Sequence, residues 1–196
     1  QIGIVFQNST LDGDLTVKEN LEIRTCFYSL TKEQRKERLN KIIKILELEP
    51  ILDRQVKKLS GGQKRKVDIA RAMVHEPKIL ILDEPTTGLD PKARLSVWNL
   101  IDRIRVETGM TVFLTTHYLE EADQATYVTI MDKGSIITSG TPTELKNKYS
   151  NDYVLAYLSK NEEFENELNK NHDKFSYLQD KKAYKIFVEN ALKAVE

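Results

Sequence analysis

The chain reads Leu59-Ser60-Gly61-Gly62-Gln63 and, a little further on, Ile79-Leu80-Ile81-Leu82-Asp83-Glu84, and these two segments decide its fold. Ser60 and Gln63 form a capping box, which predicts that a helix begins at this point. Glycines in its first turn allow close approach to the free backbone N–H groups, and this favours binding of an anion. The apolar run at 79–82 is typical of a strand covered on both faces, and it ends in two carboxylates.

Helical and strand patterns alternate from residue 59 onward, and this alternation predicts an α/β fold with parallel strands and crossover helices. Asp90 followed by Pro91 gives a helix cap with proline at the first helical position, and Gly109 is suited to end that helix. Residues 111–116 then predict the next buried strand.

The segment before residue 59 predicts a strand and a helical region. Residues 2–6 are typical of a buried strand that runs into a polar turn at residues 7–9. Residues 17–48 predict helical structure, interrupted by a second capping box. That box consists of Thr31 and Gln34, and the apolar stripe after it consists of Leu39, Ile42, Ile43 and Leu46.

Composition limits the class of protein and its partners. The 196 residues carry 30 basic and 30 acidic side chains, and a net charge of zero argues against nucleic acid as the main partner. No apolar stretch approaches the roughly 20 residues that span a bilayer, so a membrane role requires a partner chain. The single cysteine, Cys26, cannot form an internal disulfide, and we expect it in the core rather than as a reactive thiol.

Three reactive groups are expected at one edge of the sheet. Asp83, Glu84 and His117 each follow a predicted strand, and ligands of parallel sheets bind beyond the carboxyl ends of the strands. Beside a phosphate chain, Asp83 is suited to hold Mg²⁺ through its water shell, and Glu84 to accept a proton from an attacking water. His117 could hydrogen-bond the transferred phosphate or orient that water. Taken singly, the acidic pair could instead be a helix cap or a solvated turn, and the histidine a structural residue.

The joint occurrence of these segments resembles the ATPase subunits of ATP-binding cassette (ABC) transporters. The motifs appear in one order, and the resemblance covers about residues 1–148. It implies a P-loop NTPase-type three-layer α/β fold with a helical subdomain at about residues 12–75. The motifs are Leu59-Ser60-Gly61-Gly62-Gln63, Asp83-Glu84-Pro85, Gly88-Leu89-Asp90 and Thr115-Thr116-His117.

The resemblance implies ATP and Mg²⁺ as cofactors and assigns roles to single residues. Gln7 matches the Q-loop glutamine, which contacts Mg²⁺ or the attacking water, although it could be only a turn residue. Asp83 and Glu84 match the metal carboxylate and the general base, and His117 the switch histidine. The signature loop, which contacts the γ-phosphate of ATP held by a second ATPase subunit, is matched by Ser60, Gly61, Gly62 and Gln63, and the D-loop by Asp90. His75 and His172 match no motif and are expected to be ordinary surface or helix-end residues.

One motif of the family is absent from these 196 residues. None of the eight glycines is followed by lysine, so there is no Gly-Lys-Ser/Thr phosphate loop. The resemblance implies that this loop precedes the Q-loop, so we expect Gln1 to fall inside a longer domain whose N-terminal part is missing. We therefore expect the chain alone to bind ATP weakly or not at all, to lack ATPase activity, and to expose apolar sheet edges.

Finer features are similar to the drug, sodium or polysaccharide export branch, whose ATPase is a separate chain beside an ABC-2-type permease. This implies transmembrane permease subunits and a second ATPase subunit as partners, either identical or different. It also implies a location on the cytoplasmic face of the membrane. The alternatives are a soluble ABC ATPase outside transport, which would need a second cassette or long heptads, and a non-catalytic remnant.

The C-terminal residues predict a hairpin and a small α+β extension. Residues 127–131 and 136–138 flank a turn, and Thr141 to Glu144 form a third capping box. After about residue 148, strand, helix and strand are expected at residues 153–157, 161–170 and 183–188. This extension, 149–196, is similar to that of the export branch, with a regulatory, dimer-contact or simple packing role.

Overall fold

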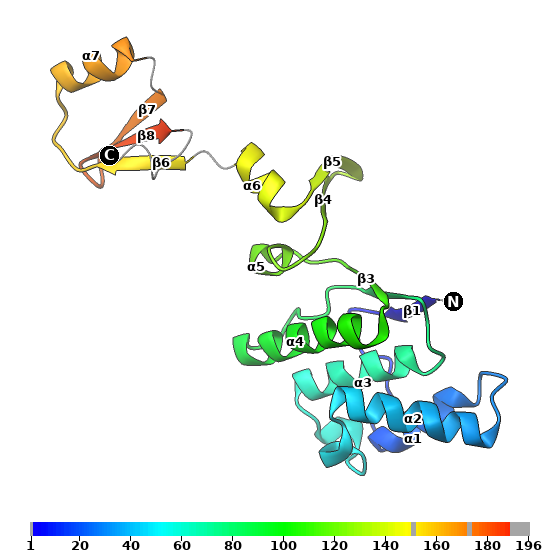
Figure 1. The fold of residues 1–196 in the computed structure, drawn as a ribbon. Helices are drawn as coiled ribbons and strands as arrows, with labels where there is room; N and C mark the ends of the chain where they lie inside the picture. The colour runs from blue at the N-terminus through cyan, green and yellow to red at the C-terminus, as the bar shows by residue number, and fades with distance from the viewer. Residues whose placement is uncertain (1, 150–151, 172–173, 189–196) are drawn as a thin grey trace. The chain divides into compact units, whose positions relative to one another are not determined.

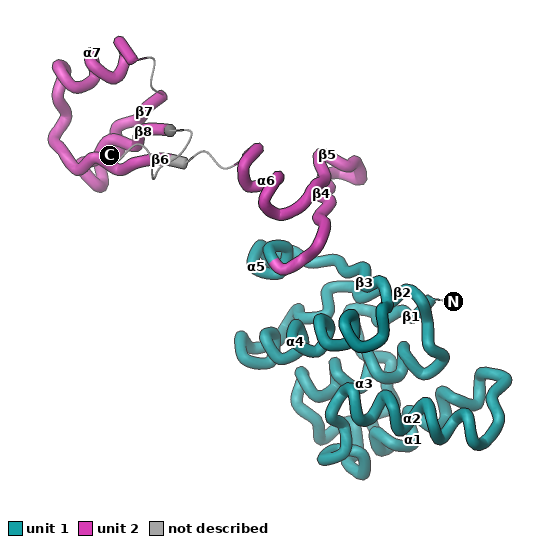
Figure 2. The backbone as a smooth tube through the Cα atoms, viewed as in Figure 1, with its two compact units in different colours: residues 1–123 teal, residues 124–196 magenta. Residues whose placement is uncertain are grey.

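The computed structural model describes residues 2–149, 152–171 and 174–188, which fall into two compact units (Figure 2). The first unit ends at Asp123 and the second begins at Gln124. A domain boundary at residue 148 and a helical subdomain at 12–75 stay predictions.

A three-stranded parallel sheet lies along one side of the first unit, and the α-helices between residues 17 and 108 lie on the other side of it (Figure 1). Its strands are β1 (Ile2–Val5), β2 (Ile79–Leu82) and β3 (Thr111–Leu114), in the order β1-β2-β3. Val5, Leu82 and Leu114 lie side by side in the register, so the three strands end level with one another. The predicted α/β class is confirmed, and the loops that follow these strands emerge at a single edge.

Three of the helices of this unit begin where the sequence predicts caps, at Thr31, Ser60 and Asp90. Besides the 3-10 turns Glu49–Ile51 and Val56–Lys58, the unit contains α1 (Val17–Thr25), α2 (Lys32–Leu46), α3 (Gly61–Met73), α4 (Pro91–Thr108) and α5 (Leu119–Ala122). The capping boxes of α2 and α3 are confirmed, since their threonine or serine accepts from the third helical N–H. The box of α1, between Thr16 and Glu19, was not predicted from the sequence.

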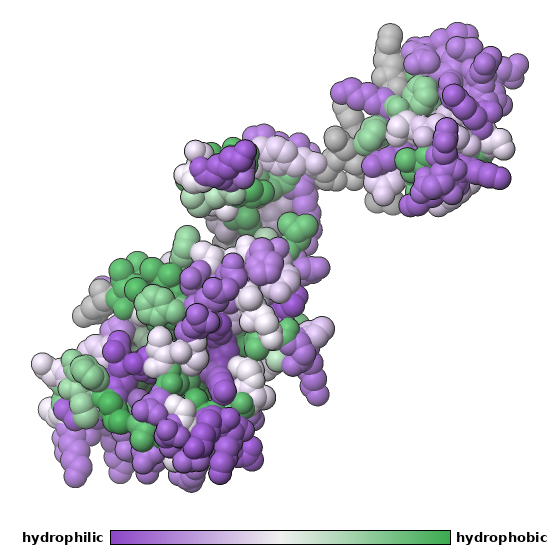
Figure 3. Space-filling view, turned by 180° about the vertical axis from the view of Figure 1, so that it is seen from behind, coloured by the Kyte–Doolittle hydropathy of each residue, from purple (hydrophilic) through white to green (hydrophobic). Residues whose placement is uncertain are grey.

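The core lies on one face of the sheet. Leu80 and Leu82 are fully buried in a cluster with side chains of the helices. On the opposite face Ile79 is 39% exposed and Phe113 is 59% exposed, so the prediction that these strands are buried on both faces is wrong. The reason is that the described helices of this unit pack against one face of the sheet only. Apolar side chains consequently gather on the surface of this unit (Figure 3).

Gly3 lies where the sheet approaches a helix closely. A Cβ atom at this position would lie 2.6 Å from the carbonyl oxygen of Ala72 in α3 and 3.0 Å from the ring of Pro77. The absence of a side chain therefore allows β1 to pack directly on the end of α3.

Cys26 does not lie in the core, contrary to prediction. It ends α1 as an exposed residue, and its Sγ atom lies 3.4 Å from the guanidinium of Arg35. The apolar side of α1 is instead formed by Val17 and Leu21, which are buried.

The second unit contains the predicted hairpin and extension, with one additional strand. Its elements are β4 (Val128–Asp132), β5 (Ser135–Gly140), α6 (Pro142–Tyr149), β6 (Asp152–Ala156), α7 (Glu162–Lys170), β7 (Lys174–Leu178) and β8 (Ala183–Val188). The hairpin β4–β5 and the capping box at Thr141 are confirmed. Strand β7 was missed, and it completes an antiparallel sheet in the order β6-β8-β7.

Tyr184 of β8 is buried and packs against neighbouring aromatic side chains of this small sheet and of α7. It is fully buried, and its hydroxyl oxygen accepts a hydrogen bond of 2.8 Å from the backbone N–H of Asn161, the cap of α7. Phe164 and Tyr177 pack against its ring.

In the described part of the chain, no helix is both long and apolar enough to cross a membrane.

Candidate functional site

The ends of three adjacent strands bring the predicted reactive residues together. Gln7 follows β1, Asp83 and Glu84 follow β2, and His117 follows β3. Because the strands are parallel and end level, these side chains gather at one edge, as the sequence predicts for Asp83, Glu84 and His117.

The carboxylate of Glu84 is the meeting point of this cluster. Its Oε2 atom accepts hydrogen bonds from Nε2 of Gln7 (3.0 Å) and from Oγ1 of Thr87 (2.9 Å). Its Oε1 atom lies 3.6 Å from Nδ1 of His117. Glu84 also has a φ angle of 41°, a left-handed conformation that costs about 1–3 kcal/mol for a residue with a side chain and is concentrated at functional sites.

Thr115 holds the two carboxylates in place, a role that was not predicted. Its Oγ1 atom donates to Oδ1 of Asp83 (2.7 Å) and accepts from the backbone N–H of Glu84 (3.0 Å). The backbone N–H of Asp83 in turn donates to the carbonyl oxygen of Val5 (2.9 Å). The orientation of both acids is therefore fixed from the neighbouring strands β1 and β3.

The donor atoms at this edge suit Mg²⁺ only in company with other ligands. Asp83 offers a carboxylate and Gln7 an amide oxygen, and hard cations prefer such oxygen donors. Within the described residues, however, no group of three or more His, Cys, Asp or Glu side chains could enclose a metal ion. A site of this kind fits Mg²⁺ that keeps waters and phosphate oxygens among its ligands.

Arg65 anchors the loop that carries Gln7, although no sequence motif singles this residue out. Its guanidinium, which is buried, donates to the carbonyl oxygens of Phe6 (2.7 Å) and Gln7 (2.8 Å). One turn further along α3, Asp68 accepts a hydrogen bond of 3.0 Å from Ser9 of the same loop. Burial raises the pKa of the Asp68 carboxyl, while its hydrogen bond with Ser9 opposes that shift.

The Leu-Ser-Gly-Gly-Gln segment lies apart from this cluster, at the start of α3. Its glycines pack closely on the next motif, because a Cβ at Gly61 would lie 3.0 Å from Leu89 and one at Gly62 would lie 3.1 Å from Ala93. Asp90 caps α4 there, accepting from the N–H of Ala93 (2.9 Å). In the part of the chain that the structure describes, no hydrogen bond or ion pair joins this segment to Asp83 or Glu84.

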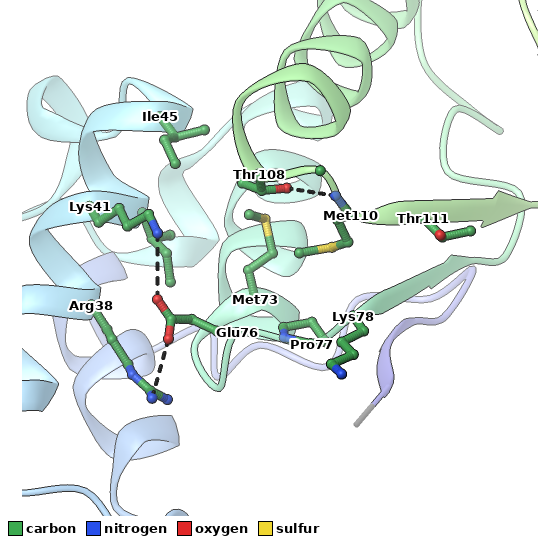
Figure 4. Close-up of a pocket in the computed structure, with 12 residues that line it drawn as sticks. Arg38, Lys41, Ile45, Met73, Glu76, Pro77, Lys78, Thr108, Met110 and Thr111 are labelled. Atoms are coloured by element: carbon green, nitrogen blue, oxygen red, sulfur yellow. Dashed lines mark hydrogen bonds and ion pairs between the residues drawn. The ribbon is translucent and has the colours of Figure 1, made fainter.

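A separate pocket of about 430 Å³ lies at the opposite ends of β2 and β3 (Figure 4). Glu76 crosses its rim to form ion pairs with Arg38 (3.2 Å) and Lys41 (3.6 Å) of α2. His75, the residue before Glu76, lies just after the end of α3, as expected for a helix-end residue. Its ring stacks on the ring of Tyr28. His172 lies outside the described residues.

The fold is α/β, with reactive residues at one end of a parallel sheet as in P-loop nucleoside triphosphatases. Comparisons with known proteins narrow this class to a family. The family model described as ABC transporter matches residues 1–87. Over 146 residues the chain is 41% identical to the Nod factor export ATP-binding protein I of Cupriavidus metallidurans, covering 74% of this chain and 48% of that protein. It is 39% identical to the daunorubicin resistance ATP-binding protein DrrA3 of Streptomyces coeruleorubidus, covering 81% of this chain and 50% of that protein.

Solved structures of the same family have the same fold. CbiO1 of Clostridium perfringens, part of the ABC transporter complex cbiONQ, matches with a TM-score of 0.69 and 33% identity, covering 74% of this chain and 58% of that one. The dimeric ATP-binding cassette MJ0796, bound to ADP and Pi, matches with a TM-score of 0.61 and 32% identity, covering 72% and 63%.

The chain belongs to the family of ABC transporter ATP-binding domains. It spans about half the length of the curated relatives it matches.

Proposed function

We propose that this sequence is part of an ATP-hydrolysing subunit that powers an ABC transporter of the export branch. One observation carries the proposal: Gln7, Glu84 and His117 meet beside Asp83 at the ends of three parallel strands. The relatives named for Nod factor export and daunorubicin resistance support export as the direction of transport.

Glu84 is the general base in this proposal. Its Oε2 atom is already occupied by Gln7 and Thr87, so Oε1 is the oxygen available to take the proton of an attacking water. His117 lies 3.6 Å from that Oε1 atom, where it would orient the water or hydrogen-bond the transferred phosphate. Positioning of this kind is most of what phosphoryl transfer requires from the protein.

Asp83, with Gln7 beside it, would hold Mg²⁺ together with waters and the phosphates of ATP. Bound there, the ion neutralises charge on the phosphoryl oxygens. The hydrogen bond from Thr115 fixes Oδ1 of Asp83, so the carboxylate keeps one orientation before the metal arrives.

The second half of the ATP site would come from another subunit. Ser60, Gly61, Gly62 and Gln63 form the start of a capped helix, where free N–H groups suit a phosphate. These residues pack on the Asp90 loop rather than on the acidic pair, so in our proposal they contact the γ-phosphate of ATP held by a second, identical or different, ATPase subunit. The permease subunits would hold this pair at the cytoplasmic face of the membrane.

Hydrolysis of ATP by the complete subunit tests this proposal. We expect Mg²⁺-dependent release of phosphate that stops when the metal is chelated. The 196-residue chain alone is expected to bind ATP weakly and to hydrolyse none, because it contains no Gly-Lys pair to hold the phosphates. A complete subunit that bound ATP and Mg²⁺ but never turned over would contradict the proposed activity.

A further inference from the structure

A buried glutamate next to the loops that carry Glu84 and His117 belongs to none of the motifs described above. Glu121 lies in the short helix α5 and is only 2% exposed. Each of its carboxylate oxygens accepts a hydrogen bond from a threonine: Oε1 from Oγ1 of Thr86, and Oε2 from Oγ1 of Thr116 at 2.6 Å. Among the described residues it forms no ion pair, so these hydroxyl groups are the partners that the structure gives its side chain.

The two threonines belong to the two loops that carry Glu84 and His117. Thr86 is 1% exposed and lies two residues after Glu84. Thr116 directly precedes His117, and its Oγ1 atom also accepts from the backbone N–H of Tyr118 at 3.0 Å. The carboxylate of Glu121 therefore connects the loop after β2 to the loop after β3 through one hydrogen bond to each.

We propose that Glu121 is a positioning residue that sets the His117 ring against the carboxylate of Glu84. Neither loop is regular secondary structure at these positions, so the 3.6 Å separation between Nδ1 of His117 and Oε1 of Glu84 has to be maintained by side chains. Removing Glu121 would leave the buried hydroxyl of Thr86 and the partly buried hydroxyl of Thr116 without their acceptor, and would release the loops from each other. The role in hydrolysis rests on the proposed function, whereas the effect on the ring does not.

Four variants of the complete subunit separate positioning from simple stabilisation. Glu121→Ala removes both acceptors, while Glu121→Gln keeps the volume and one acceptor oxygen. Thr116→Val removes the donor nearest to His117. Glu120→Ala is the matched control, because Glu120 is an exposed residue in the same short helix.

We expect Glu121→Ala to lower kcat for ATP hydrolysis by about 10- to 100-fold, with KM for ATP changed by less than about threefold, because geometry is lost rather than binding. Thr116→Val should also lower kcat. The double variant should lose less than the product of the two single losses, since both single variants remove the hydrogen bond between Thr116 and Glu121. The decrease in kcat should be smaller for Glu121→Gln, and Glu120→Ala should hydrolyse ATP at the wild-type rate.

A spectroscopic measurement tests the positioning role of Glu121 without ATP. In protein labelled at histidine and glutamate, the nuclear Overhauser contact between the His117 ring and the Glu84 side chain should be present in wild type and Glu120→Ala. It should be lost in Glu121→Ala, or weakened in Glu121→Gln if the alanine variant does not fold. Retention of this contact in a folded Glu121 variant with only a lowered melting temperature would overturn the positioning role. A wild-type subunit that hydrolysed no ATP would sink the proposed function alone, because the ring contact would still be measured.

Discussion

Gln7 and Glu84, 77 residues apart in the sequence, are joined by a hydrogen bond of 3.0 Å from the amide Nε2 to Oε2 of the carboxylate. The bond exists because β1 and β2 are adjacent and end at the same level. The loop that carries Gln7 is itself fixed by the buried guanidinium of Arg65. The carboxylate of Glu84 is thus oriented by a residue that follows the neighbouring strand.

Replacing Gln7 by alanine should therefore slow ATP hydrolysis by the complete subunit. A hydrogen bond to a charged group contributes about 1.5–3 kcal/mol, so we expect kcat to fall roughly 10- to 100-fold while the fold is retained. Asn8→Ala, at an exposed neighbour in the same loop, is the control. Equal rates for wild type and Gln7→Ala would show that this bond does not matter for catalysis.

Ser60→Arg should prevent two subunits from closing around ATP, because it introduces bulk and charge where we propose that the partner's phosphate binds. Thr31→Arg is the matched control, since Thr31 caps α2 in the same way but lies outside the signature segment. Both variants lose a helix cap worth about 0.5–2 kcal/mol, so both should be less stable. Only Ser60→Arg should abolish ATP-dependent dimerisation in size-exclusion chromatography, and a normal dimer from it would remove Ser60 from the interface.

Gly3→Ala should destabilise the fold by about 1–3 kcal/mol, because its Cβ would meet a backbone oxygen that cannot move away easily. That oxygen belongs to Ala72 and would lie 2.6 Å from the new atom. Gly13→Ala is the comparison, since its Cβ would make an ordinary contact of 3.7 Å with Lys57. Urea unfolding of both variants measures the difference, and an equal loss in both would contradict the close packing of β1 on α3.

Stability should rise with pH in the range below pH 6.5 because of His75. Burial lowers the pKa of its imidazole below the ordinary value of 6.5. The folded state then binds fewer protons than the unfolded state, so stability is complete above pH 6.5 and is lost as pH falls through the folded pKa. Melting temperatures between pH 5 and pH 7.5 should show this slope in wild type and a flatter profile in His75→Gln. Parallel profiles would rule out His75 as the cause.

Most of the fold could be predicted from the sequence because its signals are local. A capping box lies within four residues, so the starts of α2, α3 and α6 followed from Thr31, Ser60 and Thr141 alone. The shared strand edge also followed, because parallel strands with crossover helices must end on the same side. Strand β7 was missed, since Lys174–Leu178 mixes polar and apolar residues and pairs with β8 only in the folded unit.

The residues that the sequence did not indicate are those defined by distant partners. Arg65 sits in a basic run that is typical of solvated surface, and it becomes a buried anchor only through the carbonyl groups of Phe6 and Gln7. Thr115 and Glu121 likewise form hydrogen bonds that depend on loops brought together by the sheet. Neither periodicity nor composition encodes such contacts.

The most direct test of the proposed chemistry is single-turnover ATP hydrolysis by the complete subunit with Glu84→Gln. Glutamine keeps the shape of the side chain but cannot accept the proton, so we predict retained ATP binding and hydrolysis slower by about 10²- to 10⁴-fold. Unchanged hydrolysis in this variant would contradict the assignment of Glu84 as the general base, and with it the interpretation of this sheet edge as the catalytic site.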